Sequence, residues 1–197
     1  MFAELLRSKL AGICELSEPQ IERLEVHYEL LQRWNRVVSL TSVRGLEEAV
    51  ERHYCESVFA ACHLPDGPAS VADVGSGAGF PGIPIAIVRP DCSVVLMESH
   101  RRKAVFLKEA SRDLANVRVV AKRAEEVAER FDWVVSRAVR YSDIAGVLMK
   151  LGRNVELLTG EVRAEDLGGF EWQEPIRLPW GDRRLLWIGR NPAIRST

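Results

Sequence analysis

Apolar residues recur at helical spacing through the first third of the chain. The stripes cover residues 2–13, 21–34 and 46–63, and each predicts an amphipathic helix. Ser17 and Gln20 have the spacing of a capping box, which places a helix start between the first two stripes. Three short helices bury little surface on their own, so we expect them to pack as a cap on the residues that follow.

Short apolar runs alternate with helical stripes after residue 66. The predicted strands are 71–74, 93–97, 117–120, 133–136 and 155–158, with a closing hairpin of 176–178 and 185–188. The predicted helices are 101–114, 124–130 and 142–151, with one more beginning near Pro81 or Pro84. This alternation indicates an α/β fold, a parallel sheet with helices on both faces. Strand 133–136 is apolar throughout and is expected to be central.

Composition narrows the class of protein but does not indicate a function. The 197 residues fit a helical part, 1–65, and a sheet domain, 66–197, and 47% hydrophobic residues argue against disorder. A net charge of −1 gives no overall attraction to nucleic acid, so any RNA contact needs a local basic patch. No apolar run reaches the roughly 18 residues of a membrane span, and no secretion signal is evident. We expect a cytoplasmic protein that makes no membrane contact.

The cysteines and histidines give no metal pattern. None of the four cysteines forms a Cys-x-x-Cys pair, which favours free thiols in a reducing compartment. His53, Cys55, Cys62 and His63 match no zinc spacing, and positions on a helix explain them. We expect no metal.

A glycine-rich stretch follows the first predicted strand. Gly75, Gly77 and Gly79 follow Asp73 at alternate positions, and helix-compatible prolines come after them. Glycine lets a backbone turn sharply and approach a ligand closely, because no Cβ stands in the way. The N–H groups and dipole of the next helix suit a carboxylate or phosphate. A strand, glycine turn and helix in this order form the nucleotide-binding corner of a doubly wound sheet.

The glycine spacing separates the possible nucleotides. The dinucleotide fingerprint needs Gly-x-Gly-x-x-Gly, but Phe80 occupies its third glycine position here. The order acidic-x-Gly-x-Gly-x-Gly resembles the first motif of S-adenosylmethionine-dependent methyltransferases. Glu98 ends the second strand, where a carboxylate accepts hydrogen bonds from ribose hydroxyls of either cofactor. A turn with no ligand is the alternative, and an NAD-linked reductase ranks last because no catalytic tyrosine–lysine pair stands out.

Four separate stretches of the chain carry a family resemblance: residues 39–44, Arg52-His53, residues 73–84 and Ser136-Arg137-Ala138. Together they resemble the RsmG (GidB) family of bacterial 16S ribosomal RNA (guanine(527)-N7)-methyltransferases. The resemblance covers nearly the whole chain. It implies a Rossmann-like, seven-stranded methyltransferase sheet with an N-terminal helical extension, and a closing hairpin that supplies one antiparallel strand.

The resemblance also implies site residues. Gly75 and Phe80 would line the S-adenosylmethionine site, Ala124 and Glu125 would frame the adenine, and Arg137 would lie near the reacting end. With the glycine-loop residues, the expected cofactor-binding set is Asp73, Gly75, Gly77, Gly79, Phe80, Glu98, Ala124, Glu125 and Arg137. The alternatives are a helix N-terminal acid for Glu125 and a surface ion pair for Arg137. The expected RNA-binding residues are Arg44, Arg52, His53, Arg101, Arg102, Lys103 and Arg140.

Guanine N7 already carries a lone pair, so the sequence is not expected to provide a catalytic base. The expected partner is 16S rRNA or the small ribosomal subunit, met by a monomer. Two departures from the family concern the RNA side: Thr159 stands where a lysine is common, and residues 139–154 are shortened. They leave two alternatives open: a small-molecule methyltransferase with the helical part as a lid, and a non-catalytic relative that binds the cofactor or the ribosome.

Overall fold

The computed structural model describes residues 1–137, 140–160 and 167–194. One mixed sheet organises the chain, in the order β3-β2-β1-β4-β5-β8-β6, with β7 also paired to β8. The first five strands along this order pair in parallel, whereas β8 runs antiparallel to β5. The strands are β1 (Ser70–Val74), β2 (Ser93–Met97), β3 (Val117–Val120), β4 (Phe131–Arg137), β5 (Gly152–Thr159), β6 (Glu171–Trp172), β7 (Ile176–Arg177) and β8 (Leu185–Arg190). The α/β sheet expected from the sequence is confirmed, and β4 is central.

The last position of the sheet is divided between two short strands. β6 pairs with Arg190 and Gly189 of β8, and β7 pairs with Leu186 and Leu185 further along the same strand. Pro175 lies between β6 and β7 and has no N–H to donate to the ladder. The described residues therefore form eight strands where seven were expected, and the extra one comes from this interruption. β7 and β8 are the predicted hairpin.

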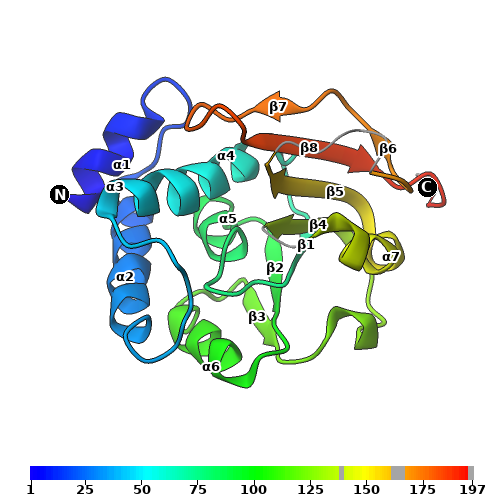
Figure 1. Cartoon of the computed structure of the whole chain (residues 1–197), viewed down its shortest axis with the longest axis horizontal. Coiled ribbons are helices and arrows are strands. Elements are labelled where there is room, and N and C mark those ends of the chain that lie inside the picture. The colour runs from blue at the N-terminus through cyan, green and yellow to red at the C-terminus, as the bar shows by residue number, and fades with distance from the viewer. Residues whose placement is uncertain (138–139, 161–166, 195–197) are drawn as a thin grey trace.

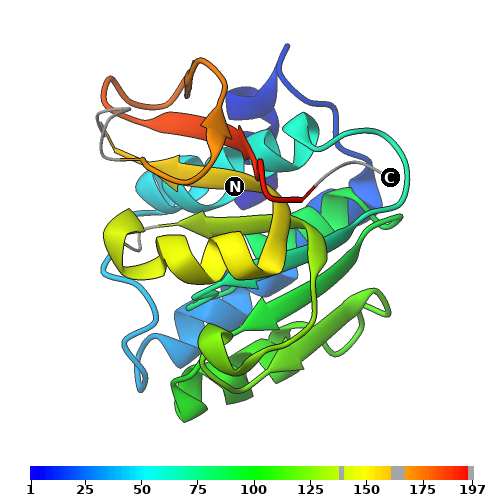
Figure 2. The same cartoon turned by 90° about the vertical axis from the view of Figure 1, so that its right-hand side faces the viewer.

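Helices cover both faces of the sheet (Figures 1 and 2). On one face, α7 (Tyr141–Leu151) packs against β4 and β5. The other face carries α5 (Gly82–Val88) and α6 (Arg101–Ala110), together with the N-terminal helices. The predicted helix at 101–114 thus ends four residues early, and only the 3₁₀ turn η2 (Ala124–Glu126) forms where 124–130 was expected.

The N-terminal helices are α1 (Phe2–Leu10), α2 (Glu18–Trp34), α3 (Leu46–Ala49) and α4 (Glu56–His63), with a π-helical segment, η1 (Val50–Cys55), between α3 and α4. The capping box that starts α2 is confirmed, because the Ser17 N–H donates to Gln20 Oε1 at 2.9 Å. The π segment was not predicted.

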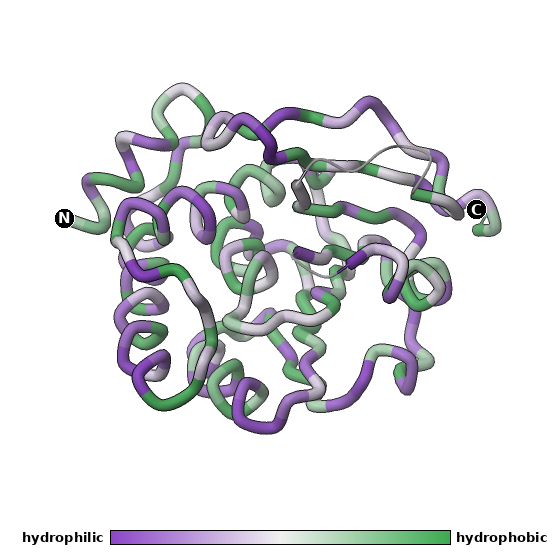
Figure 3. The backbone as a smooth tube through the Cα atoms, viewed as in Figure 1, coloured by the Kyte–Doolittle hydropathy of each residue, from purple (hydrophilic) through white to green (hydrophobic). Residues whose placement is uncertain are grey.

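These helices share a core with the sheet. Leu6, Leu24 and Tyr54 belong to the same buried cluster as Val71 of β1 and Phe106 of α6. The backbone coloured by hydropathy shows hydrophobic strands at the centre and hydrophilic stretches on the outer helices (Figure 3). The boundary at residue 65 stays a prediction, and the apolar contacts run across it.

Candidate active site

The glycine loop turns sharply at the carboxyl end of β1. Gly75, Gly77 and Gly79 have φ angles of 75°, 57° and 88°, in the left-handed region that favours glycine. The N–H groups of Gly75 and Ser76 both donate to the Met97 carbonyl at 3.0 Å. The loop is thereby attached to the end of β2 and leaves Gly75 exposed at the rim of the sheet.

Glu98 holds the same loop from the other side. Its Oε2 accepts the Gly77 N–H at 3.0 Å, and its Oε1 accepts the His100 N–H at 2.7 Å. The carboxylate is 9% exposed and lines the cavity described below. Each oxygen keeps a further lone pair that could accept a hydrogen bond from a hydroxyl group.

Asp73 lies beneath the loop instead of on its surface. Its side chain is fully buried, and its Oδ2 accepts the Gly82 N–H, the first of α5, at 3.0 Å. Oδ1 has no hydrogen-bond partner in the described residues. Burial raises the pKa of this carboxyl to about 7. The acceptor for the first N–H of α5 is therefore supplied by the protein itself, and Asp73 supports the loop.

A cavity of about 300 Å³ opens at the carboxyl ends of β1, β2 and β3. Gly75, Glu98, Ala124 and Glu125, all expected cofactor residues, line it. Its apolar walls come from Val74, Met97, Ile144 and Val147. Open α/β sheets bind ligands at this edge, and an apolar slot beside a carboxylate suits a purine attached to a ribose.

Arg137 ends β4 and contacts the side chains of His53 and Phe80. Its Nη1 donates to the Arg52 carbonyl at 2.8 Å and to His53 Nδ1 at 2.9 Å. The guanidinium carbon lies 5.2 Å from the centre of the Phe80 ring, and the His53 ring stacks on Phe80 at 4.6 Å. Arg137 forms no ion pair within the described residues, so the structure does not support the alternative of a surface ion pair.

Phe80 and His53 are both buried, with exposed fractions of 2% and 4%. Neither lines the cavity that holds Gly75 and Glu98. Both ring nitrogens of His53 are bonded within the protein, to Arg137 and to Thr41 Oγ1. The structure therefore places His53 behind Arg137, not at a surface that a phosphate could reach. Ala138, the last residue of its motif, lies outside the described residues.

The remaining expected RNA-binding residues lie at the surface. Arg101, Arg102 and Lys103 form the first turn of α6, and Arg140 directly precedes α7. Among them, Arg52 pairs with Glu48 at 2.7 Å, whereas Arg44, Arg101, Arg102, Lys103 and Arg140 form no ion pair with any described residue. Helices α6 and α7 start shortly after β2 and β4 end, so Arg101, Arg102, Lys103 and Arg140 lie along the rim that carries the cavity.

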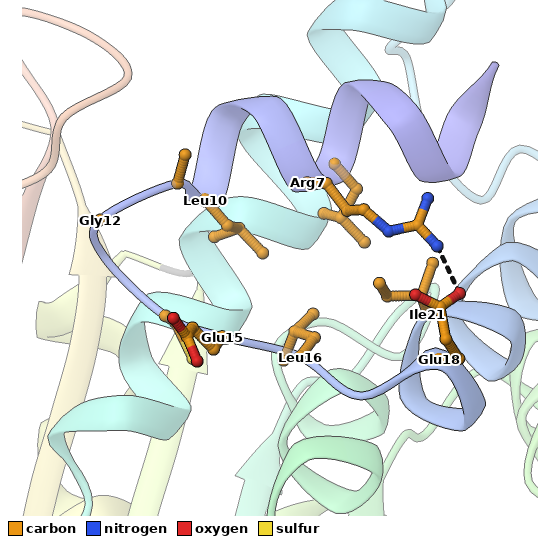
Figure 4. A pocket seen from close by; sticks show the side chains of 10 residues that line it. Arg7, Leu10, Gly12, Glu15, Leu16, Glu18 and Ile21 are labelled. Atoms are coloured by element: carbon orange, nitrogen blue, oxygen red, sulfur yellow. Dashed lines mark hydrogen bonds and ion pairs between the residues drawn. The ribbon is translucent and has the colours of Figure 1, made fainter.

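A second cavity, of about 410 Å³, lies between α1, the following loop and α2 (Figure 4). Leu10, Leu16 and Ile21 contribute apolar walls, and Arg7 forms an ion pair with Glu18 beside it. It contains none of the expected site residues and lies away from the strand ends. We therefore place the candidate site at the first cavity.

Comparison with known proteins identifies the family of the chain. Residues 20–165 match the family described as GidB, rRNA small subunit methyltransferase G. The chain belongs to this family. A ribosomal RNA small subunit methyltransferase G from Chromobacterium violaceum is 37% identical over 91% of this chain and 85% of its own. One from Dichelobacter nodosus is 43% identical over 74% and 70%.

Solved structures at lower identity show the methyltransferase fold. A Burkholderia thailandensis 1,6-didemethyltoxoflavin-N1-methyltransferase, with S-adenosylhomocysteine bound, matches 90% of this chain and 92% of its own at a TM-score of 0.56 and 18% identity. The Methanococcus jannaschii fibrillarin pre-rRNA processing protein matches 63% and 66% at a TM-score of 0.53 and 14% identity. The Rossmann-like fold expected for this methyltransferase is confirmed.

Two residues that support the site of this methyltransferase were missed in the sequence. His27 of α2 is buried and bonds the Ala78 carbonyl of the glycine loop at 3.1 Å and the Tyr54 hydroxyl at 2.9 Å. Thr41 bonds His53 at 2.7 Å. A signal existed for His27, since it lies within the apolar stripe of its helix between Leu24 and Leu31. Thr41 lies in a polar loop and gave none beyond its family motif.

Within the described residues, no group of three or more His, Cys, Asp and Glu side chains is placed to hold a metal ion. None of the described helices is both long enough and apolar enough to cross a membrane.

Proposed function

We propose that this chain transfers the methyl group of S-adenosylmethionine to N7 of guanine 527 in 16S ribosomal RNA, acting as a cytoplasmic monomer without a metal. The observation that carries the proposal is the cavity that joins Gly75, Glu98, Ala124 and Glu125 at the rim of the sheet, in a chain of the rRNA small subunit methyltransferase G family.

The residues present fit an adenosine-type cofactor. Glu98 offers free lone pairs to ribose hydroxyls, and Ala124 and Glu125 lie where the adenine would pack against apolar walls. Gly75 is exposed at the mouth, so a ligand can approach its backbone. Arg137, after β4, would receive an anionic group, either the carboxylate of the cofactor or an RNA phosphate.

S-adenosylmethionine supplies a methyl group that is already activated by the sulfonium. The N7 lone pair needs no deprotonation, so the task of the protein is to align N7 with that methyl. Orientation of two reactants can contribute on the order of 7–11 kcal/mol. We therefore assign no general base among the residues of the cavity.

The RNA must present its base outside a continuous helix. N7 lies in the deep, narrow major groove of A-form RNA, which side chains cannot read, so we expect an unstacked or looped guanine. Arg44, Arg101, Arg102, Lys103 and Arg140 would hold the phosphates around it. Because counterions are released when cations bind phosphates, methylation should fall steeply as salt increases. A rate that is independent of salt would contradict an RNA substrate.

A matched pair of substitutions tests the cofactor site. Gly75→Arg should abolish S-adenosylmethionine binding in calorimetry by filling the mouth of the cavity. Gly12→Arg is the control, because Gly12 has the same φ (74° against 75°) and open space around it, but lies in the loop after α1. If the two variants bind alike, the cavity is not the cofactor site.

The substrate is tested by mapping N7-methylguanine in small-subunit RNA from cells with and without this gene. Loss of one methylated guanine at position 527 is the expected result. Turnover of a metabolite without any RNA methylation would favour the small-molecule alternative. Cofactor binding without turnover, with turnover gained in the Thr159→Lys variant, would favour a non-catalytic relative.

A further inference from the structure

Residues from four distant stretches of the chain meet at the end of β4. Thr41 comes from the loop before α3, His53 from the π segment η1, Phe80 from the glycine loop and Arg137 from β4. The chain of contacts runs from Thr41 Oγ1 to His53 Nε2 at 2.7 Å, and from His53 Nδ1 to Arg137 Nη1 at 2.9 Å. None of these four residues lines the cavity. Arg137 is the one of them with side-chain N–H groups left unpaired among the described residues.

The hydrogen bonds assign a single tautomer to His53. A guanidinium can only donate, so His53 Nδ1 must be the acceptor of the bond from Arg137. The ring hydrogen is then on Nε2 and is donated to Thr41 Oγ1, which also accepts the Val43 N–H at 3.1 Å. A second ring hydrogen, on Nδ1, would point at the guanidinium N–H, so the imidazole is neutral here.

The electrostatic surroundings of His53 agree with this assignment. Burial, together with the nearby charges of Arg137 and Arg52, lowers the pKa of His53 to about 3. His27, the other histidine that acts on it, is buried and has a pKa of about 4. Tyr54 also packs on Phe80, and its pKa lies well above its ordinary value. His53, His27 and Tyr54 therefore each keep one charge state between pH 5 and 8, whereas Asp73, whose charge also acts on Arg137, has a pKa of about 7.

One nitrogen of Arg137, Nη1, makes all of the hydrogen bonds of this side chain to the described residues. The two hydrogens of Nη1 are used by the Arg52 carbonyl and by His53. Nε and Nη2 have no hydrogen-bond partner among the described residues. These two nitrogens form the edge of a guanidinium that binds carboxylate or phosphate in bidentate fashion. His53 thus binds Arg137 through Nη1 and leaves Nε and Nη2 available to a ligand.

We propose that His53 is a positioning residue that acts through Arg137: with Thr41 behind it and Phe80 beneath it, it orients the Nε–Nη2 edge toward an anionic group of the bound reactants. The inference rests on the proposed function for the identity of those reactants. The anion is a pair of carboxylate or phosphate oxygens, supplied by the cofactor or by the RNA.

Two substitutions separate positioning from packing. In His53→Asn, Oδ1 replaces Nδ1 as the acceptor for Arg137, whereas in His53→Gln the amide replaces Nε2 and keeps only the bond to Thr41. We expect His53→Asn to retain most of the wild-type kcat/KM and His53→Gln to lose about 10- to 100-fold, since small misplacements near the reacting groups have effects of that size. A role in packing predicts the reverse order, because glutamine fills more of the space. That reverse order, with both variants folded by circular dichroism, would overturn the proposal.

A double-mutant cycle tests the path through Arg137. In the Arg137→Met background, His53→Gln should have no further effect on kcat/KM, because there is no guanidinium left to orient. Additive losses would show that His53 acts by another route. The cycle also separates the two anions: a fall in cofactor affinity without RNA identifies the carboxylate, whereas a raised KM for RNA and a shallower salt dependence identify a phosphate.

A spectroscopic test does not depend on the reaction. In protein labelled with ¹⁵N-histidine, His53 should give the signals of the neutral Nε2–H tautomer, unchanged from pH 5 to 8. Titration near pH 6.5, or the other tautomer, would overturn the inference even if RNA is methylated. If this signature and the cofactor-affinity differences are found but no RNA is methylated, the proposed substrate fails and the positioning role stands.

Discussion

At the scale of single residues, the sequence best predicted the positions of residues that follow the carboxyl ends of parallel strands. Gly75 follows β1, Glu98 follows β2, and Ala124 and Glu125 come soon after β3, so all four line one cavity. Side-chain direction could not be predicted in the same way. Asp73 is one residue from the end of β1, but strand alternation points it at α5 and away from the rim.

Gly82 illustrates a constraint that only the packed structure reveals. A Cβ at this position would lie 2.3 Å from Leu96 Cδ2 and 2.6 Å from Asp73 Oδ2. We expect Gly82→Ala to lower the free energy of unfolding by about 1–3 kcal/mol through overpacking, measured by urea denaturation. Gly146 in α7 is the control: nothing lies within 4 Å of its Cβ position. Gly146→Ala should therefore raise stability, by about 0.5–1 kcal/mol. Equal effects of the two substitutions would contradict this account of Gly82.

At the scale of elements, long periodic segments were predicted well and short or irregular ones were not. The stripe over 46–63 reads as one helix, because a single π segment shifts the periodicity too little to interrupt it. That segment nevertheless brings the Arg52 carbonyl and His53 to Arg137. β6 has two residues and no alternation that a pattern could detect.

The loop after α1 lies against α4 through two thiols. Cys62 Sγ lies 2.7 Å from Cys14 Sγ and donates to it, which lowers the pKa of Cys14 to about 7. We expect diamide to oxidise the pair to a disulfide, with loss of two hydrogens by mass spectrometry. Closing a loop of 48 residues should then add up to about 4 kcal/mol of stability, seen as a higher Tm that dithiothreitol reverses. Cys62→Ser should remove both the mass change and the shift in Tm, and their persistence would contradict the assignment.

At the scale of the whole molecule, two buried histidines and two buried carboxyl groups change the pH dependence of stability in opposite directions. The pKa values of His27 and His53 are lowered by burial, to about 4 and about 3. Burial raises the pKa of Asp73 to about 7 and that of Glu156 well above its ordinary value. Between about pH 4.5 and 6.5 the unfolded chain binds the histidine protons, while the folded chain binds the carboxyl protons. The two contributions to the pH dependence of stability therefore have opposite signs.

Removing one of these ionisable groups should make the free energy of unfolding depend more steeply on pH. With Glu156→Gln, the unfolded state binds one proton more than the folded state over this range. The free energy of unfolding should then rise with pH by about 1.4 kcal/mol per unit, whereas the wild-type curve stays shallow. Glu156 is the suitable choice, because both of its carboxylate oxygens are buried without a hydrogen-bond partner in the described residues. Parallel curves for the two proteins, measured by denaturation at pH 5, 5.5 and 6, would show that Glu156 is ionised in the folded state.

The bond from His27 to the Ala78 carbonyl has a consequence for how reactants could enter. If the N-terminal helices were a mobile lid, they would have to separate from the glycine loop without breaking buried hydrogen bonds or exposing aromatic rings. Rotating α2 away would leave the Ala78 oxygen without its donor and would uncover Phe80, on which His27 packs at 5.2 Å. The N-terminal helices thus serve as fixed scaffolding for the glycine loop, and access to the cavity has to come from the open rim.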